Sequence, residues 1–306
     1  MCSTELGCRR TRSATSSPAP AVPEAEPSAA ADTGFSVLLP VYHRDFPAFL
    51  RRAFRSVTTE QTLMPDEVVI VRDGPVGPEL GQTLDELVAT SPVPVVVVEL
   101  AENVGLARAL EQGLERCSYE IVARMDADDI SRPERFAVQI PLVMGGLDIV
   151  GSAIEEFADE GVASRGVVRT PPLTSEDIVR SARFHSPFNH PSVVYRRTAV
   201  ASAGGYLDLP LLEDYWLFAR MIMRSPRVLN VPEPLVLYRV GAGAYARRGG
   251  RQLFLSELRL QWRLRRSGFS TVPQFVRNVA VRGGYRLVPE VLRRQIYRAF
   301  LLDRSR

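Results

Sequence analysis

The chain has 306 residues, of which 45% are hydrophobic and 24% are charged, and its formal net charge is +3. These values are close to the averages of globular proteins, which excludes a collagen, a coiled coil and a chain that is disordered throughout. No apolar run approaches the roughly 18 residues of a membrane span, so we expect a soluble or peripheral protein.

The basic and sulfur-containing residues exclude several chemistries. All 38 basic residues are Arg, so the chain has no lysine for a Schiff base, for pyridoxal phosphate or for a P-loop. Cysteine occurs only at Cys2, Cys8 and Cys117, which fits neither a disulfide framework nor a zinc cluster. We therefore expect a reducing, cytoplasmic setting.

The N-terminal segment has a composition of its own. Ala, Pro, Ser and Thr dominate residues 1–33, and large apolar side chains are almost missing there. Such a segment buries too little surface to offset the entropy of ordering, so we predict a disordered tail. No apolar stretch follows Arg9 and Arg10, so we do not expect a twin-arginine export signal.

From residue 34 onward, apolar runs typical of strands alternate with helical spacing. We predict strands at Phe35–Val41, Glu67–Arg72, Val93–Leu100 and Tyr119–Met125, and helices at Phe46–Val57, Pro78–Ala89 and Val104–Cys117, the last capped by Asn103. This alternation predicts a parallel, doubly wound α/β sheet, in which ligands bind beyond the carboxyl ends of the strands. The less regular second half has predicted strands at Asp148–Phe157 and Leu235–Arg239, and helices at Ser175–Arg183 and Leu212–Met223.

Three carboxylates stand where the fourth predicted strand ends. Asp126, Asp128 and Asp129 repel one another and stay ionised only beside a cation or hydrogen-bond donors. Strand alternation would place Asp126 and Asp128 on one side, and oxygen ligands of this kind suit Mg²⁺ or Mn²⁺. The alternative role is helix capping, but Ser131 and Glu134 already form a predicted capping box, which leaves the aspartates for a metal ion.

The C-terminal part of the chain is strongly basic. Residues 247–306 hold 15 Arg and three acids, a net charge of +12. Within them, we predict that Gln252–Arg266 is a helix packed between two surfaces. The amphipathic segment Val291–Leu302 either lies on an anionic membrane or packs on the domain with a solvated Arg face. We expect no nucleic-acid partner, because interleaved aromatic residues are not evident.

An ordered set of motifs resembles the family 2 bacterial glycosyltransferases of the GT-A fold: VLLPVYHR, VIVRDGP, ENVGLARALEQGLE and MDADDISRPERF. Four later segments resemble the subgroup that builds exopolysaccharides, amylovoran-type enzymes among them: FNHPSVVYRR, GGY, LLEDYWLFARM and YRVGAGAYARRGG. The resemblance covers about residues 35–250. It implies a Rossmann-like, mostly parallel sheet flanked by helices, with a nucleotide-binding half at 34–130, an acceptor-binding, catalytic half at 131–246 and a basic helical extension at 247–306.

The resemblance also implies which residues hold the donor. In the family, the acid after the second strand bonds the uracil, which here is Asp73, and the DxD-type acids contact ribose and metal. The implied nucleotide-sugar ligands are Pro40, Tyr42, Arg44, Asp73, Asn103, Gly105, Arg108, Asp126 and Asp128. Asp128 and Asp129 are the implied ligands of a Mn²⁺ or Mg²⁺ ion.

The implied catalytic residues come from the second half. Asp214 matches the family's base, with Glu213 as its support or as an acceptor contact, because inverting transfer needs a carboxylate that takes the proton of the acceptor hydroxyl. The alternative is that Asp214 only places a negative charge at a helix N-terminus. His190 contacts the acceptor or the diphosphate, or is simply a buried, hydrogen-bonded histidine. Arg247 and Arg248 close over the leaving diphosphate, or belong to a solvated basic face.

We therefore expect a metal-dependent, inverting transferase that moves one sugar from a UDP-sugar to a lipid-linked or growing glycan, at the inner face of the cell membrane. The QxxRW motif of processive relatives is absent, which favours transfer of a single sugar. The alternative is a membrane-surface or scaffold protein with a degenerate GT-A domain. A haloacid-dehalogenase-type phosphatase is disfavoured by Ile130 and by the missing lysine, and a dehydrogenase by the loop PVYHRD.

Overall fold

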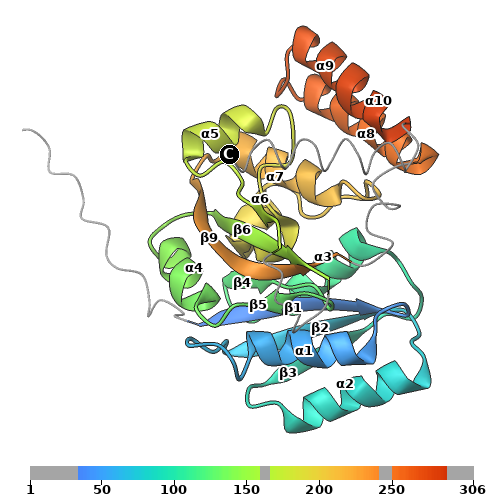
Figure 1. Cartoon of the computed structure of the whole chain (residues 1–306), viewed down its shortest axis with the longest axis vertical. Helices are drawn as coiled ribbons and strands as arrows, with labels where there is room; N and C mark the ends of the chain where they lie inside the picture. Colours follow the sequence, from blue (N-terminus) through green and yellow to red (C-terminus); the bar gives the residue numbers. More distant parts are fainter. Residues whose placement is uncertain (1–33, 159–165, 241–249, 288–306) are drawn as a thin grey trace, which may run out of the picture. The chain divides into compact units, whose positions relative to one another are not determined.

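The computed structural model describes residues 34–158, 166–240 and 250–287, and Figure 1 shows how their helices and strands are arranged. Several predicted features lie outside the described residues. These are the tail at 1–33, Arg247 and Arg248, and the amphipathic segment Val291–Leu302.

A nine-stranded sheet has the order β3-β2-β1-β4-β8-β6-β9-β5, with β7 paired to β6. Its strands are β1 (Phe35–Tyr42), β2 (Glu67–Asp73), β3 (Val95–Glu99), β4 (Ile121–Arg124), β5 (Ile130–Ser131), β6 (Ile149–Phe157), β7 (Val168–Arg169), β8 (Val194–Arg196) and β9 (Val228–Arg239). The long ladders, of β1 with β2 and β4, of β2 with β3 and of β6 with β9, are parallel. The short strand β8 runs antiparallel to β4 and β6. The sheet is therefore mostly parallel, as predicted.

Helices cover both faces of the sheet. They are α1 (Pro47–Val57), α2 (Pro78–Thr90), α3 (Leu106–Arg116), α4 (Arg135–Met144), α5 (Ser175–Ser181), η1 (His190–Ser192), α6 (Arg197–Ser202) and α7 (Glu213–Arg224), followed by α8 (Arg251–Arg266), α9 (Val272–Asn278), η3 (Val279–Gly283) and α10 (Gly284–Leu287). Along β1, Val37 and Leu39 face the apolar core under α1, α2 and α4, while Leu38 faces that under α3, α5, α6 and α7. Because alternate residues fill two cores, β1 is a continuous apolar run in the sequence.

Two predicted helix caps are wrong. The N-cap residue of α3 is Gly105, which makes no side-chain cap bond, and Asn103 donates its amide to Asp73 instead. Ser131 and Glu134 form no capping box, because Ser131 lies in β5 and the N-cap residue of α4, Glu134, makes no side-chain cap bond. In both places tertiary contacts override the local pattern.

The predicted late strand at Leu235–Arg239 is the second half of β9, which begins at Val228. Pro232 and Pro234 made its first half look unlike a strand, because proline cannot donate to a ladder. The register between β6 and β9 shifts beside these prolines, as at a β-bulge. The bulge lets one long strand continue to Arg239.

Helix α8 confirms the predicted helix at Gln252–Arg266. Three of its leucines join a buried cluster with Tyr215 and Trp216 of α7. On the same face of α8, one turn after Leu253, the fully buried Glu257 pairs with Arg282 of η3, with 2.7 Å between Oε1 and Nε. The helix therefore has one buried face, which contacts both α7 and η3, while Leu255 and Trp262 on the opposite face are exposed. The prediction that it packs between two surfaces is wrong.

We predict that Gly113→Ala destabilises the protein, because a Cβ there would lie 2.4 Å from Leu38 Cδ1 and 2.6 Å from Val71 Cγ2. Overpacking of this kind costs about 1–3 kcal/mol. The matched control is Gly81→Ala in α2, where the nearest atom is Val76 Cγ2 at 3.9 Å. It should stabilise by about 0.5–1 kcal/mol, the helical advantage of alanine. Urea unfolding measures both; equal midpoints for the two variants would contradict the prediction.

Candidate functional site

The residues expected to bind a ligand gather at the carboxyl ends of β1, β2 and β4. The register pairs Tyr42, at the end of β1, with Asp73, at the end of β2. Met125 follows β4 and donates its N–H to the carbonyl of Leu38 in β1. Because these strands are parallel neighbours, the turn after β4 opens at the same edge of the sheet, where α/β proteins bind ligands.

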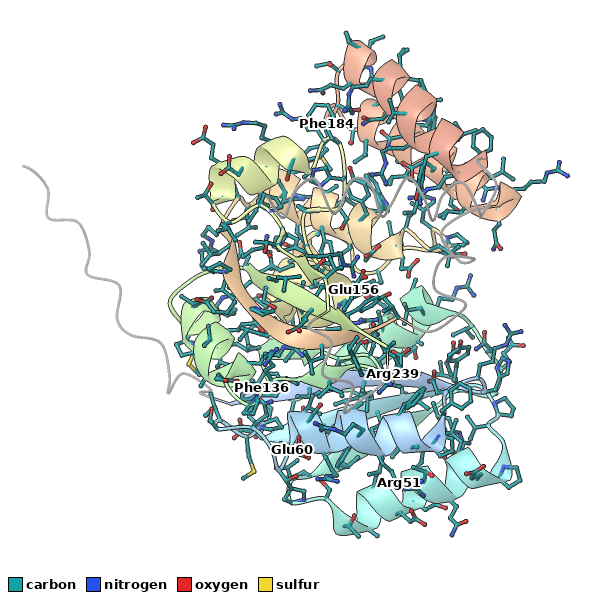
Figure 2. All side chains as sticks on the ribbon, viewed as in Figure 1. Arg51, Glu60, Phe136, Glu156, Phe184 and Arg239 are labelled. Carbon is teal, nitrogen blue, oxygen red and sulfur yellow. The ribbon has the colours of Figure 1, made fainter. Side chains whose placement is uncertain are left out.

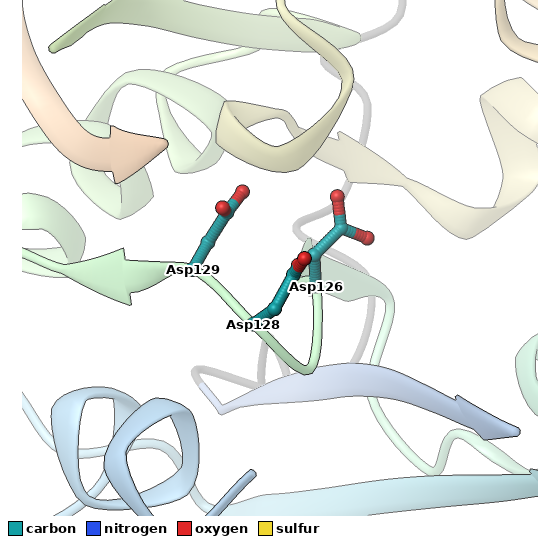
Figure 3. Close-up of side chains that lie close together, drawn as sticks. All are labelled: Asp126, Asp128 and Asp129. Atoms are coloured by element: carbon teal, nitrogen blue, oxygen red, sulfur yellow. The ribbon is translucent and has the colours of Figure 1, made fainter. Parts of the chain in front are cut away.

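The acid cluster, formed by Asp126, Asp128 and Asp129, lies in that turn. Strand β4 ends at Arg124, so the expected alternation of Asp126 and Asp128 along a strand does not apply. One carboxylate oxygen from each acid nevertheless lies within 4.8 Å of the others. Figure 3 shows the three side chains on the same side of the turn. The cluster exists, although the turn forms it and not the strand.

Two arginines from the sheet offset the charge of the acid cluster. Arg124, which is 1% exposed, forms an ion pair with Asp126. Arg239, at the end of β9, donates its backbone N–H to Asp129 Oδ1 at 2.8 Å and its Nε to the carbonyl of Asp128 at 2.8 Å. Donors and cations of this kind lower the electrostatic cost of placing carboxylates close together.

Asp129 has an oxygen to spare for a metal ion. Its side chain is buried, and within the described residues its Oδ2 is inaccessible and has no hydrogen-bond partner. Burial and the charges of Asp126 and Asp128 raise the pKa of Asp129 well above its ordinary value. A divalent cation would relieve both penalties, and carboxylate oxygens are the ligands that Mg²⁺ and Mn²⁺ prefer. The residues present therefore fit such an ion.

Asp73 organises the loop that follows β3. Its Oδ1 accepts the N–H of Val104 at 2.7 Å, and its Oδ2 accepts the N–H of Gly105 at 3.1 Å and the amide of Asn103 at 3.0 Å. Gly105 has a φ of 85°, which favours glycine. Asp73, Asn103 and Gly105 thus belong to one structure, in which Asp73 holds the loop that leads into α3. The contact of Asp73 with uracil stays a prediction.

Glu213 and Asp214 open helix α7 side by side. Asp214 Oδ1 accepts the N–H of Tyr215 at 2.7 Å, and its side chain is 22% exposed. Burial, and then the charge of Asp214, raises the pKa of Glu213 to about 7. Burial also raises the pKa of Asp214. The pair is thus tuned towards neutral pH, where a general base works best.

His190 lies beside Asp214. Its Nδ1 is 3.9 Å from Asp214 Oδ2, and its Nε2 is 3.1 Å from the hydroxyl of Tyr206, which in turn contacts the hydroxyl of Tyr195. Burial, and then the charge of Arg124, lowers the pKa of His190 well below its ordinary value, so the ring is neutral. The structure places His190 against the expected base; its contact with the acceptor or diphosphate stays a prediction.

The remaining expected ligands lie in β1, in the turn after it and on α3. Pro40 and Tyr42 are half-buried, and Arg44 and Arg108 are exposed. The sequence reasoning missed Arg124, although an arginine inside the otherwise apolar run of β4 is an anomaly that signals a buried charge partner. It also missed Arg239 and Tyr206, whose neighbours in space are distant in sequence.

Residues 36–204 match Glycosyl transferase family 2, and the chain belongs to this family. It is 39% identical over 243 residues to the amylovoran biosynthesis glycosyltransferase AmsE of Erwinia amylovora, covering 77% of this chain and 88% of that one. It is 33% identical over 266 residues to the UDP-Gal:alpha-D-GlcNAc-diphosphoundecaprenol beta-1,3-galactosyltransferase of Escherichia coli, covering 86% and 95% of the two chains. The predicted resemblance is confirmed.

The fold has a counterpart among solved structures. The mannosyltransferase PcManGT of Pyrobaculum calidifontis, in complex with GDP-Man and Mn²⁺, superposes with a TM-score of 0.56 at 19% identity, covering 86% of this chain and 73% of that one. The GT-A fold, a mostly parallel sheet flanked by helices, is thereby confirmed. No helix within 34–158, 166–240 and 250–287 has the length and apolar character needed to cross a bilayer.

Proposed function

We propose that the protein transfers one sugar, with inversion, from a UDP-sugar to a lipid-linked or growing glycan in bacterial polysaccharide synthesis. The observation that carries this proposal is the acid cluster at the end of β4, near the raised-pKa pair Glu213 and Asp214. By their names, the Erwinia relative takes part in amylovoran biosynthesis, and the Escherichia coli relative acts on a diphosphoundecaprenol-linked acceptor. Both descriptions suit an enzyme that works at the inner face of the cell membrane.

The acid cluster is the proposed donor site. Asp128 and Asp129 would hold Mn²⁺ or Mg²⁺, the latter through Oδ2, which lacks a hydrogen-bond partner among the described residues, with Asp126 beside them towards the ribose. When bound, the ion offsets the charge that develops on the departing diphosphate. Arg124 forms an ion pair with Asp126 from inside the sheet.

The nucleotide is proposed to lie along the same sheet edge. Asp73 holds the loop that would receive the uracil, and the other proposed contacts are Pro40, Tyr42, Arg44, Asn103, Gly105 and Arg108. Arg108 is exposed on α3, where it is free to approach the phosphates. Arg247 and Arg248 keep their proposed role at the leaving diphosphate.

Asp214 is the proposed general base. Its Oδ1 is engaged by the N–H of Tyr215, so Oδ2 is the atom that would take the proton of the acceptor hydroxyl. His190 lies on the side of that oxygen and, being neutral, does not neutralise it. Glu213 raises the basicity of its neighbour by charge repulsion, or contacts the acceptor.

We predict that Asp214→Asn and Asp128→Asn fail in different ways. Loss of the base should lower kcat by about 10²–10⁴-fold and leave binding of UDP with Mn²⁺ unchanged. Asp128→Asn should weaken that binding. Calorimetry with UDP, with and without Mn²⁺, and a sugar-transfer assay measure the two effects. Full turnover by either variant contradicts the role assigned to that residue. A wild-type chain that binds vesicles but does not bind UDP would instead support the alternative of a membrane-surface or scaffold protein.

We predict that kcat/KM rises with pH with an apparent pKa near 7, because the buried pair Glu213 and Asp214 must lose a proton before one carboxylate can act as base. Glu213→Gln removes a negative charge beside Asp214, so the rising limb should move to lower pH. A pH-rate profile of both proteins measures the shift. A limb that stays in place in Glu213→Gln would show that the two carboxyl groups do not titrate together.

A basic face of α8 is the proposed contact with an anionic membrane. Leu255, Arg259, Trp262 and Arg266 recur at helical spacing on this α8 outer face, where Leu255 and Trp262 are 48% and 53% exposed. The single acid of residues 250–287, Glu257, is buried on the opposite side. Exposed apolar side chains among arginines are typical of membrane-surface helices.

We predict that Arg259→Gln weakens binding to anionic vesicles about fivefold, since each arginine near such a surface contributes about 1 kcal/mol. Trp262→Ala should weaken it as well, through lost apolar burial. The matched control is Arg116→Gln, an exposed arginine of α3, which should bind as the parent does. Co-sedimentation with phosphatidylglycerol and phosphatidylcholine vesicles measures this; equal binding to both lipids would contradict the proposal.

A further inference from the structure

Arg239 occupies an unusual environment at the end of β9 (Figure 2). Its side chain is 7% exposed, and its guanidinium carbon lies 3.8 Å from the ring centre of Phe49 and 4.4 Å from that of Phe157. Phe49 belongs to α1 and Phe157 to the end of β6. Arg239 therefore brings three separate elements together beside the acid cluster.

The two aromatic rings leave the guanidinium little freedom. A desolvated cation over an aromatic face is attracted by the ring, and contacts with two rings fix the plane of the guanidinium. The guanidinium can then donate hydrogen bonds only in its own plane, and Nε donates to the carbonyl of Asp128 at 2.8 Å. Lysine, with no planar fork, cannot combine these contacts in the same way.

The bonds made by Arg239 fix the turn without using the oxygens that a metal ion needs. The side chain of Arg239 donates to the main-chain carbonyl of Asp128, and its backbone N–H donates to Oδ1 of Asp129. Oδ2 of Asp129 has no hydrogen-bond partner among the described residues. The positive charge of Arg239 also offsets the mutual repulsion of the acids, which otherwise favours an open turn.

We propose that Arg239 is a positioning residue for the metal site: clamped between Phe49 and Phe157, it holds the Asp128–Asp129 turn in the ion-binding geometry before the ion arrives. This inference rests on the proposed role of the acid cluster in metal binding. Residues that orient metal ligands without touching the metal typically change affinity by about 10–100-fold when lost.

The test is the affinity of the full chain for Mn²⁺ in the presence of UDP, measured by calorimetry and by the Mn²⁺ electron paramagnetic resonance signal. Arg239→Met should weaken Mn²⁺ binding about 10–100-fold and leave metal-free UDP binding unchanged. Arg239→Lys should restore only part of the affinity. The matched control is Arg169→Met, whose guanidinium lies 4.8 Å from the ring centre of Tyr238, on the same sheet; it should bind Mn²⁺ as the parent does.

The outcomes separate this proposal from the function on which it rests. Mn²⁺ affinity within twofold of the parent in Arg239→Met, with Asp128→Asn defective, overturns the role of Arg239 alone. Unchanged Mn²⁺ binding in Asp128→Asn overturns the metal site itself. If Arg239→Met does not fold, Phe49→Leu takes its place, because it removes one ring and keeps the hydrogen bond to Asp128. Unchanged Mn²⁺ affinity in that variant also overturns the proposal.

Discussion

The buried ion pair between Arg124 and Asp126 is the interaction on which the rest of the site depends. A charge removed from water is tolerated only when it is paired, and leaving one partner alone costs several kcal/mol. The charge of Arg124 also favours the ionised forms of Asp129, Glu213 and Asp214. One guanidinium inside the sheet therefore serves both the acid cluster and the pair formed by Glu213 and Asp214. This shared cation explains how so many acids can lie near one another in a largely buried place.

The sequence predicted the first half of the fold well, because each element there has an unambiguous period. Strands such as β1 are buried on both faces and form apolar runs, and the helices between them have one apolar face. The second half was harder. Strands β5, β7 and β8 have only two or three residues, too few to show any period, and the prolines of β9 concealed its first half. The two misplaced caps failed because Asn103 and Ser131 have partners across the fold.

The chemistry of the site was predictable where it lies in one stretch of sequence. Asp126, Asp128 and Asp129 lie within four residues of one another, and their repulsion calls for a cation or hydrogen-bond donors in any fold. Arg239 is 110 residues from Asp129, and no local pattern connects them. The same holds for Tyr206 and His190, whose contact depends on how α6 and η1 pack. Sequence reasoning thus found the charges that need neutralising and missed the groups that neutralise and orient them.

The segment 182–184 anchors α7 and the C-terminal helices at once. The hydroxyl of Tyr215, next to Asp214, donates to the carbonyl of Ala182 at 2.8 Å, while Asn278 and Arg282 donate to the next two carbonyls along the chain. A chain shortened before α8 would therefore expose Tyr215 and Trp216 of α7, which pack against α8, and loosen the start of α7, where the proposed base lies. If such a truncated protein were inactive, with or without lipid, the loss would reflect a damaged scaffold. Only substitutions on the exposed face of α8 can separate membrane binding from catalysis.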